Sequence, residues 1–155
     1  MIKIEIPGRQ PLELHSLVLD YNGTIARDGE LLPGILPRIA QLCKDLQIYV
    51  LTADTYGTVS QQCADINVTV RTFPREGAAE CKAEIVRELQ GGTVAVGNGF
   101  NDIQMFDEAD LSVAVLGKEG ICASLLQHAD VLVTSPADAM DLLLYPNRLR
   151  ATLRS

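Results

Sequence analysis

Two patterns of hydrophobic and polar positions alternate along this chain. Compact apolar runs, typical of buried strands, are separated by segments in which apolar residues recur at helical spacing. The strands predicted in this way are 17–19, 48–52, 68–70, 93–96, 111–115 and 131–133. The helices predicted between and after them are 34–46, 55–64, 77–89, 101–109, 121–128 and 136–144. Such regular alternation predicts a three-layer α/β fold, in which helices cover both faces of a mainly parallel sheet.

Two β-hairpins are predicted beside this core. In residues 1–15, isoleucines and leucines alternate with polar residues on either side of a Pro-Gly break, so we expect an amino-terminal hairpin that extends the sheet. In residues 25–32, the pair Asp28-Gly29 marks a smaller hairpin directly after the first core strand. There is no linker, repeat or low-complexity segment, and we expect one domain that spans residues 1–155.

Charge and composition narrow the classes of partner. Thirteen basic residues against 20 acidic ones give a formal net charge of −7, which opposes binding to nucleic acid or to an anionic membrane surface. No apolar run approaches the length of a membrane span, and the first residues lack the pattern of an export signal. The four cysteines form no CxxC pair. We therefore expect a cytoplasmic protein that binds neither membranes nor nucleic acid.

Polar side chains follow several of the predicted strands. The run 17–19 leads directly into Asp20, and a turn follows. The polar residues at such strand ends, or early in the helix before the fourth core strand, are Asp20, Thr52, Lys82, Asn98 and Asp102. Because the carboxyl ends of parallel strands share one edge of a sheet, these residues can converge there. Each residue taken alone also has a purely structural interpretation, as a turn, strand or solvated helix residue.

The order and spacing of these residues resemble the haloacid dehalogenase superfamily of phosphohydrolases. Within it, they resemble the phosphorylation domain of P-type ATPases and their small soluble relatives. The matching motifs are Asp20-Tyr21-Asn22-Gly23-Thr24, Thr52, Lys82 and Gly97-Asn98-Gly99-Phe100-Asn101-Asp102. The resemblance covers residues 16–133 and implies the Rossmann-like fold of that superfamily.

The resemblance implies catalytic roles for Asp20, Thr52 and Lys82. Asp20 would be the nucleophile that attacks phosphorus and becomes an aspartyl phosphate. Thr52 would hydrogen-bond a phosphoryl oxygen, and Lys82 would hold Asp20 in place and offset negative charge. Main-chain amides of the loop after Asp20 would complete a phosphate site that consists of Asn22, Gly23, Thr24, Thr52 and Lys82.

The resemblance also implies a Mg²⁺ site, with Asp20, Asn98, Asp102 and the main-chain carbonyl of Asn22 as ligands. Phosphatases of the superfamily usually carry an Asp where this chain has Asn22, and that Asp acts as general acid and then as general base. An amide does neither, and the loss of such a catalyst costs about 10²- to 10⁴-fold in rate. Asn98 also replaces a common metal-binding Asp, so we expect Mg²⁺ to bind weakly. Turn chemistry is an equally good reason for both Asn-Gly pairs.

The intervals between the motifs leave no room for a cap domain. The chain from Asp20 to Thr52 holds only the small hairpin, one helix and one strand, and the chain from Thr52 to Lys82 is similarly short. Superfamily members without a cap have open sites, and they tend to act on large substrates or to cover the site with a neighbouring subunit. We therefore expect a homo-oligomer.

Two interpretations of function follow. We favour a slow, Mg²⁺-assisted phosphohydrolase or phosphotransferase that forms an aspartyl phosphate on Asp20 and acts on a phosphorylated substrate. The alternative is a non-catalytic phosphate-binding or subunit-interaction module with the same fold, which Asn22 and Asn98 would allow. A dinucleotide-binding domain is disfavoured because Asp102 stands where that motif needs its third glycine. A receiver domain is disfavoured because nothing acidic adjoins Asp20 in its strand.

Overall fold

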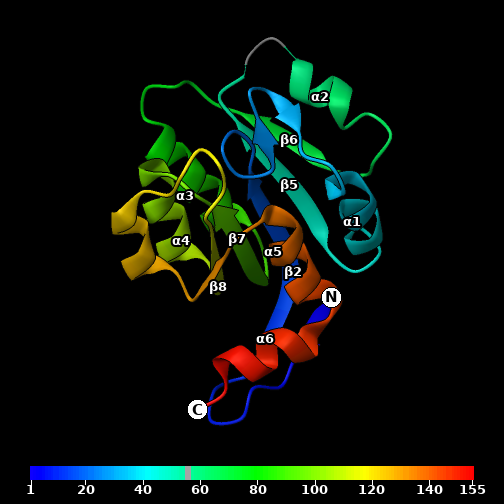
Figure 1. Cartoon of the computed structure of the whole chain (residues 1–155), viewed down its shortest axis with the longest axis vertical. Coiled ribbons are helices and arrows are strands. Elements are labelled where there is room, and N and C mark those ends of the chain that lie inside the picture. The colour runs from blue at the N-terminus through cyan, green and yellow to red at the C-terminus, as the bar shows by residue number, and fades with distance from the viewer. Residues whose placement is uncertain (55–56) are drawn as a thin grey trace.

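A mainly parallel sheet runs through the computed structural model of the chain, which describes residues 1–54 and 57–155 (Figure 1). The strands lie in the order β6-β5-β2-β7-β8-β9, and all these neighbours are parallel. Their bounds are β2 Leu12–Asp20, β5 Gln47–Thr52, β6 Thr69–Thr72, β7 Gly92–Gly97, β8 Leu111–Val115 and β9 Val131–Val133. β1 (Ile2–Ile4) pairs antiparallel with the beginning of β2, so one long strand serves both the amino-terminal hairpin and the core.

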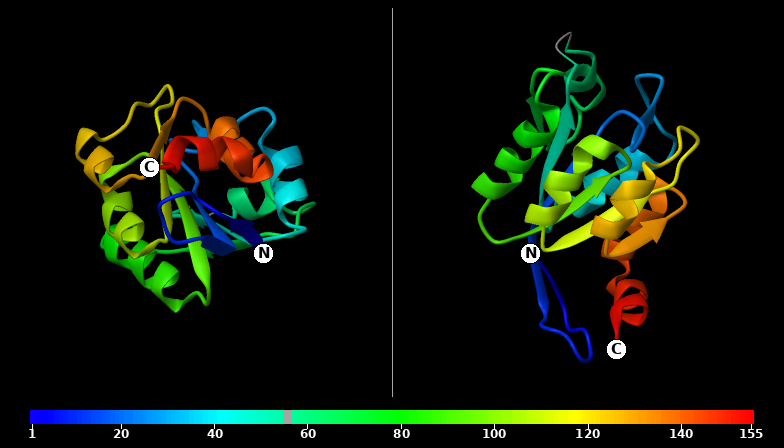
Figure 2. Two further views of the ribbon diagram at one scale, coloured as in Figure 1. Left: turned by 90° about the horizontal axis from the view of Figure 1, so that it is seen from below. Right: turned by 90° about the vertical axis from the view of Figure 1, so that its left-hand side faces the viewer.

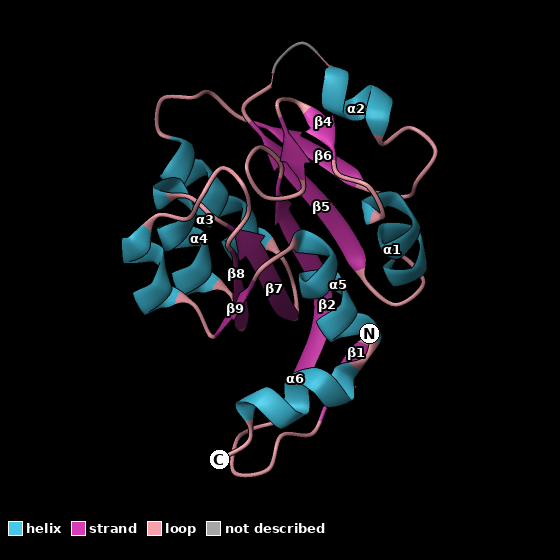
Figure 3. Cartoon of the chain, viewed as in Figure 1, coloured by secondary structure: helices cyan, strands magenta, loops and turns pink. Residues whose placement is uncertain are grey.

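Helices cover both faces of the sheet (Figure 2). Their bounds are α1 Ile35–Leu42, α2 Thr58–Gln62, α3 Ala78–Glu88, α4 Ile103–Glu108, α5 Pro136–Leu144 and α6 Pro146–Leu153. α3 packs against α4 on one face, and α1 packs against α5 on the other. α6 contacts β1 at the end of the molecule where the amino-terminal hairpin lies (Figure 3). None of the helices in the described ranges is long and apolar enough to cross a membrane.

The central strand is buried on both faces. Leu17 and Leu19 belong to the core under α1 and α5, whereas Val18 between them belongs to the core under α3 and α4. This explains the uninterrupted apolar run in the sequence, because a strand between two helical layers needs apolar residues at every position. Asp20 is the last residue of this strand, between the carboxyl ends of β5 and β7.

The predicted α/β order of strands and helices is confirmed, including the small hairpin after the first core strand. That hairpin consists of β3 (Ala26–Arg27) and β4 (Glu30–Leu31). Asp28 and Gly29 form its turn with φ angles of 52° and 82°, as this type of tight turn requires. In the described part of the intervals between Asp20, Thr52 and Lys82, the chain forms only sheet strands, this hairpin and flanking helices.

Some helices differ from the prediction. The helix predicted at 121–128 forms at Ala123–His128, and it is a 3₁₀ helix. Leu125 is the buried residue of this segment, and a short connector with one apolar anchor often adopts the tighter 3₁₀ geometry. A 3₁₀ turn at Phe100–Asp102 also precedes α4. The predicted helix 55–64 corresponds to α2, and its first two residues, 55 and 56, lie outside the described residues.

Candidate active site

The predicted residues meet in a cleft of about 220 Å³ at the carboxyl ends of the central strands. The predicted residues that line it are Asp20, Asn22, Thr52, Lys82 and Asn98. They come from the ends of β2, β5 and β7 and from α3, so the fold gathers them from separate parts of the sequence. The remaining predicted residues, Gly23, Thr24 and Asp102, do not line the cleft.

Lys82 is a buried cation between two carboxylates. Its side chain is only 2% exposed, and Nζ lies 2.6 Å from Asp20 Oδ1 and 2.7 Å from Asp102 Oδ1. A third hydrogen bond, of 3.2 Å, goes to Asn101 Oδ1, so all three ammonium hydrogens have an acceptor. Burial alone would lower the pKa of Lys82, but Asp20 and Asp102 outweigh it and raise that pKa. The ammonium therefore stays charged and fixes the Asp20 carboxylate.

Asp20 is held at both oxygens. Lys82 bonds Oδ1, and the Thr24 hydroxyl donates to Oδ2 at 3.0 Å. Burial, together with the nearby Asp102 carboxylate, raises the pKa of Asp20 to about 7, against the opposing effect of Lys82. A bound cation beside Asp20 would favour the ionised carboxylate, which is the form that a nucleophile needs.

Asp102, one of the predicted metal ligands, is engaged by groups of the protein. It is fully buried, and its Oδ2 accepts the main-chain N–H groups of Asn98 and Gly99, both at 2.9 Å. Its Oδ1 is the partner of Lys82, so both oxygens are already bonded. A Cβ at Gly97 would lie 2.4 Å from Asp102 Oδ2, which explains the glycine there. In this geometry Asp102 orients Lys82 and the loop after β7.

Asn98 joins three loops. Its Nδ2 donates to the carbonyl of Gly120 at 3.1 Å, and its main-chain carbonyl accepts the N–H of Cys122 at 2.9 Å. Its Oδ1 lies 3.2 Å from the hydroxyl of Thr24. A Cβ at Gly23, where φ is 80°, would lie 2.7 Å from Asn98 Nδ2. The amide is thus packed closely into the site, and its donor group has a partner that a carboxylate at this position would repel.

The cleft offers a small set of oxygen ligands for Mg²⁺. The Thr24 hydroxyl approaches both Asp20 Oδ2 and Asn98 Oδ1, so these two oxygens converge. Carboxylate and amide oxygens suit Mg²⁺, which takes its remaining ligands from water and phosphate. Across the described ranges, no group of three or more His, Cys, Asp or Glu side chains gathers in a metal-binding arrangement. The residues that line the cleft therefore fit a Mg²⁺ site.

Sequence reasoning missed three contributions to the site. Asn101 bonds Lys82, the ring of Phe73 lies 5.8 Å from Lys82 Nζ, and Thr24 bonds Asp20 through its side chain. Asn101 and Thr24 belong to the motifs, but the sequence does not show that their side chains turn inward. Phe73 follows β6 and carries no signal that separates it from a core residue.

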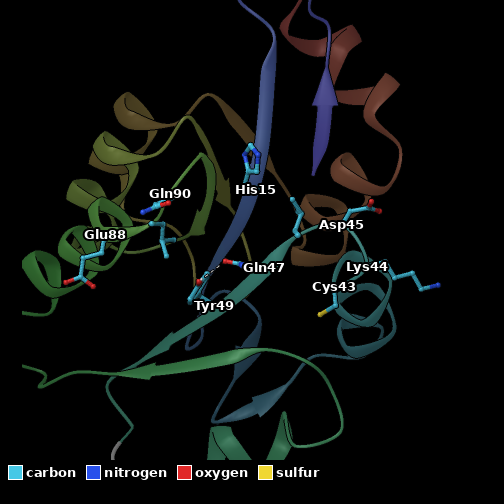
Figure 4. A pocket seen from close by; sticks show the side chains of 10 residues that line it. His15, Cys43, Lys44, Asp45, Gln47, Tyr49, Glu88 and Gln90 are labelled. Carbon is cyan, nitrogen blue, oxygen red and sulfur yellow. Dashed lines mark hydrogen bonds between the residues drawn. The ribbon is translucent and has the colours of Figure 1, made fainter.

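Another hollow lies at the opposite end of the sheet. It has a volume of about 620 Å³ and is lined by residues from the amino-terminal halves of β2 and β5. Figure 4 shows His15 from β2, Gln47 and Tyr49 from β5, and Glu88 from α3 around it. None of the predicted site residues lines this hollow, so its size does not connect it with the chemistry.

Comparison with known sequences gives an uncharacterized relative and relatives with a described function. The chain matches no protein-family model. It is 44% identical over 78 residues to an uncharacterized protein of Methanocaldococcus jannaschii, which covers 47% of this chain and 84% of that protein. It is 28% identical over 137 residues to a soluble P-type ATPase-like phosphatase of the same organism, which covers 82% of this chain. It is 30% identical over 137 residues to a phospholipid-transporting ATPase of Saccharomyces cerevisiae, which covers 88% of this chain. The chain spans 50% of that phosphatase and 10% of that transporter.

Solved structures share the fold. A cobalt-bound deoxy-D-mannose-octulosonate 8-phosphate phosphatase from Haemophilus influenzae matches with a TM-score of 0.70 at 13% identity, over 91% of this chain and 94% of that chain. A 3-deoxy-D-manno-octulosonate 8-phosphate phosphatase from Moraxella catarrhalis, solved with a magnesium ion, a phosphate ion and a KDO molecule, matches with a TM-score of 0.66 at 12% identity. The match covers 91% of this chain and 94% of that chain. At these identities the likeness concerns the fold alone.

Proposed function

This chain belongs to the haloacid dehalogenase superfamily, as a relative of the P-type ATPase phosphorylation domain, and we propose that it transfers phosphoryl groups through an aspartyl phosphate on Asp20. The observation that carries the proposal is the buried unit of Asp20, Lys82 and Asp102 at the cleft. Burying two carboxylates and one ammonium is costly, and a merely structural core is often as stable without such a unit. The need to hold a reactive carboxylate in a fixed orientation explains why this protein has such a buried unit.

In the first step, a carboxylate oxygen of Asp20 attacks phosphorus. The new P–O bond forms while the bond to the leaving group breaks, and the electron pair leaves with that group's oxygen. Lys82 and Thr24 hold the carboxylate oxygens in one orientation. The Thr52 hydroxyl accepts the N–H of Asp54 at 3.0 Å, which leaves its own proton to donate to a phosphoryl oxygen.

Mg²⁺, when bound, supplies positive charge that neutralises the phosphoryl oxygens. In our proposal Asp20, the Asn98 side chain and the main-chain carbonyl of Asn22 hold it, while Asp102 acts indirectly through the loop it bonds. With one carboxylate among these ligands, phosphate binding would depend less on Mg²⁺ than in a site with two or three.

Turnover in this proposal is slow, because Asn22 has no proton to give to the leaving group and removes none from water. Substrates whose leaving group is stable as an anion, such as acyl phosphates, would react first. The phosphoenzyme would then persist, and water or a second acceptor would remove the phosphoryl group. We further propose a cytoplasmic protein that acts on a phosphorylated small molecule and self-associates beside the cleft, where Phe100 is 70% exposed.

The alternative is a phosphate-binding module without turnover. It is favoured by one observation, the tight packing of the Asn98 amide between Thr24 and Gly120. Release of phosphate from acetyl phosphate separates the two functions. We expect slow, Mg²⁺-stimulated release that is lost in Asp20→Asn and kept in the surface control Asp110→Asn. Phosphate binding without release by the unaltered protein would favour the module.

A further inference from the structure

A second and larger cleft adjoins the reaction cleft. Its volume is about 530 Å³, and both clefts are lined by Asn22 and Ala53. A phosphoryl group on Asp20 fills the smaller cleft in our proposal, so the rest of a substrate must extend into neighbouring space. The larger cleft is continuous with the reacting end through these two shared residues.

The loop after β5 and the loop after β6 each contribute residues to both clefts. After β5, Thr52 lines the reaction cleft and Asp54 lines the larger cleft, with the shared Ala53 between them. After β6, Phe73 lines the reaction cleft, and the next residue but one, Arg75, lines the larger cleft. The larger cleft therefore stands beside the reacting group along the neighbouring strands β2, β5 and β6.

One wall of the larger cleft is rigidly built. The hydroxyl of Tyr21 donates to the carbonyl of Gly29 at 2.8 Å, and Gln62 Nε2 donates to the same carbonyl at 2.9 Å. Gln62 Oε1 in turn accepts the N–H of Leu31 at 3.0 Å. These bonds tie the β3–β4 hairpin and α2 to the residue after the nucleophile. A preformed wall of this kind lowers the entropic cost of holding a ligand.

Arg75 is a cation of this cleft that has no polar partner among the described residues. It is exposed, and within residues 1–54 and 57–155 no hydrogen bond or ion pair of its guanidinium is present. Among the described residues, Lys82 is the other cation that lines either cleft, and three acceptors already engage it. Arg75 is therefore the group at which a second negative charge on the substrate would be stabilised.

From this arrangement we infer that the larger cleft holds the leaving group of the substrate, and that the leaving group carries a second anion, a carboxylate or another phosphate, that pairs with Arg75. The inference rests on the proposed function, because it takes the phosphoryl group to be on Asp20. Arg75 is thus a specificity residue, and it takes no part in the chemical step.

The test compares ligands that differ in the second anion only. 3-Phosphoglycerate is matched with glycerol 3-phosphate, and fructose 1,6-bisphosphate with fructose 1-phosphate. Their dissociation constants are measured by calorimetry with Mg²⁺, for the unaltered protein, for Arg75→Gln and for Arg27→Gln. Arg27 is an exposed arginine that lines neither cleft and controls for the change in net charge.

We expect the unaltered protein and Arg27→Gln to bind the doubly anionic member of at least one pair about fivefold more tightly, as a partly exposed ion pair allows. In Arg75→Gln the preference should fall to about one. Preference in the first pair identifies a carboxylate, and preference in the second pair identifies a phosphate. Equal affinities within both pairs, or a preference that survives in Arg75→Gln, overturn the inference and leave the proposed function standing if orthophosphate binds. No binding of orthophosphate or of any ester overturns both.

Discussion

Lys82 and Asp20 lie 62 residues apart in the sequence and form a buried ion pair of 2.6 Å. The pair joins the helix before β7 to the end of the central strand, and Asp102 closes it on the other side. Because both partners are almost inaccessible to water, neither charge is compensated by solvent if the other is removed.

Lys82→Met should therefore destabilise the protein strongly. The substitution leaves the carboxylates of Asp20 and Asp102 buried without their cation, which costs about 3–5 kcal/mol of the free energy of unfolding. Urea denaturation at neutral pH measures the loss. The matched control is Lys44→Met, at an exposed lysine, which should change stability by less than about 0.5 kcal/mol. Equal stability of the two variants would refute the view that Lys82 compensates both carboxylates.

Asn22→Asp should speed the loss of phosphate from the phosphoenzyme. The new carboxylate removes a proton from the attacking water, and such general-base catalysis contributes at least about 10²-fold. The decay of the phosphoryl adduct, followed by intact mass after removal of the phosphate donor, gives the rate. Asn67→Asp adds the same charge at an exposed site and should leave the decay unchanged. If Asn22→Asp decays no faster than the unaltered protein, position 22 does not limit hydrolysis.

Asn98→Asp should make stability depend on Mg²⁺. The change replaces a donor to the Gly120 carbonyl with an acceptor and adds negative charge near Asp20, so in chelator it should cost about 1–3 kcal/mol. Added Mg²⁺ should then raise the melting temperature of this variant more than that of the unaltered protein. A variant that is stable in chelator and unresponsive to Mg²⁺ would contradict the role we give to the Asn98 amide.

The ion pair between α1 and α5 predicts a stability difference that depends on pH. Arg38 Nε lies 2.8 Å from Asp141 Oδ1, and its Nη2 lies 3.2 Å from Oδ2. The hydrogen bonds from Arg38 lower the pKa of Asp141 below the ordinary value of 3.8. The contribution is therefore fully present above the unfolded pKa and is lost as pH falls through the lower, folded pKa.

Asp141→Asn should thus cost about 1 kcal/mol at pH 7, a modest value because water partly screens the pair. The two proteins should converge in stability as the pH falls from about 4 towards 2. Urea midpoints across this range provide the measurement. A constant difference at all pH values would mean that Asp141 does not act through its charge.

The fold was predictable because its signals are local. An uninterrupted apolar run before Asp20 requires a strand buried on both faces, and parallel strands place Asp20, Thr52 and Asn98 at one edge. The rest depends on loop conformation and on contacts between distant segments. The burial of Asp102, whose two oxygens bond Lys82 and the loop after β7, has no periodic signal in the sequence.

The residues that line the larger cleft could not be predicted from the sequence either. Arg75 reaches it because the loop after β6 crosses from one cleft to the next, and its sequence neighbours give no sign of this. The 3₁₀ helix at Ala123–His128 could not be predicted as such, because helical spacing alone does not distinguish it from an α-helix. Leu125 is the buried residue of this segment.

The central claim is that Asp20 becomes phosphorylated, and intact mass after incubation with acetyl phosphate and Mg²⁺ tests it most directly. A prior mass measurement should show that neither Asn22-Gly23 nor Asn98-Gly99 has deamidated, because deamidation would create a carboxylate at these positions. We predict a Mg²⁺-dependent adduct of one phosphoryl group that Asp20→Asn abolishes and that Asp110→Asn retains. Borohydride should displace the phosphate from this adduct and leave homoserine at position 20. A folded protein that binds phosphate but forms no adduct, or an adduct that persists in Asp20→Asn, would contradict the account.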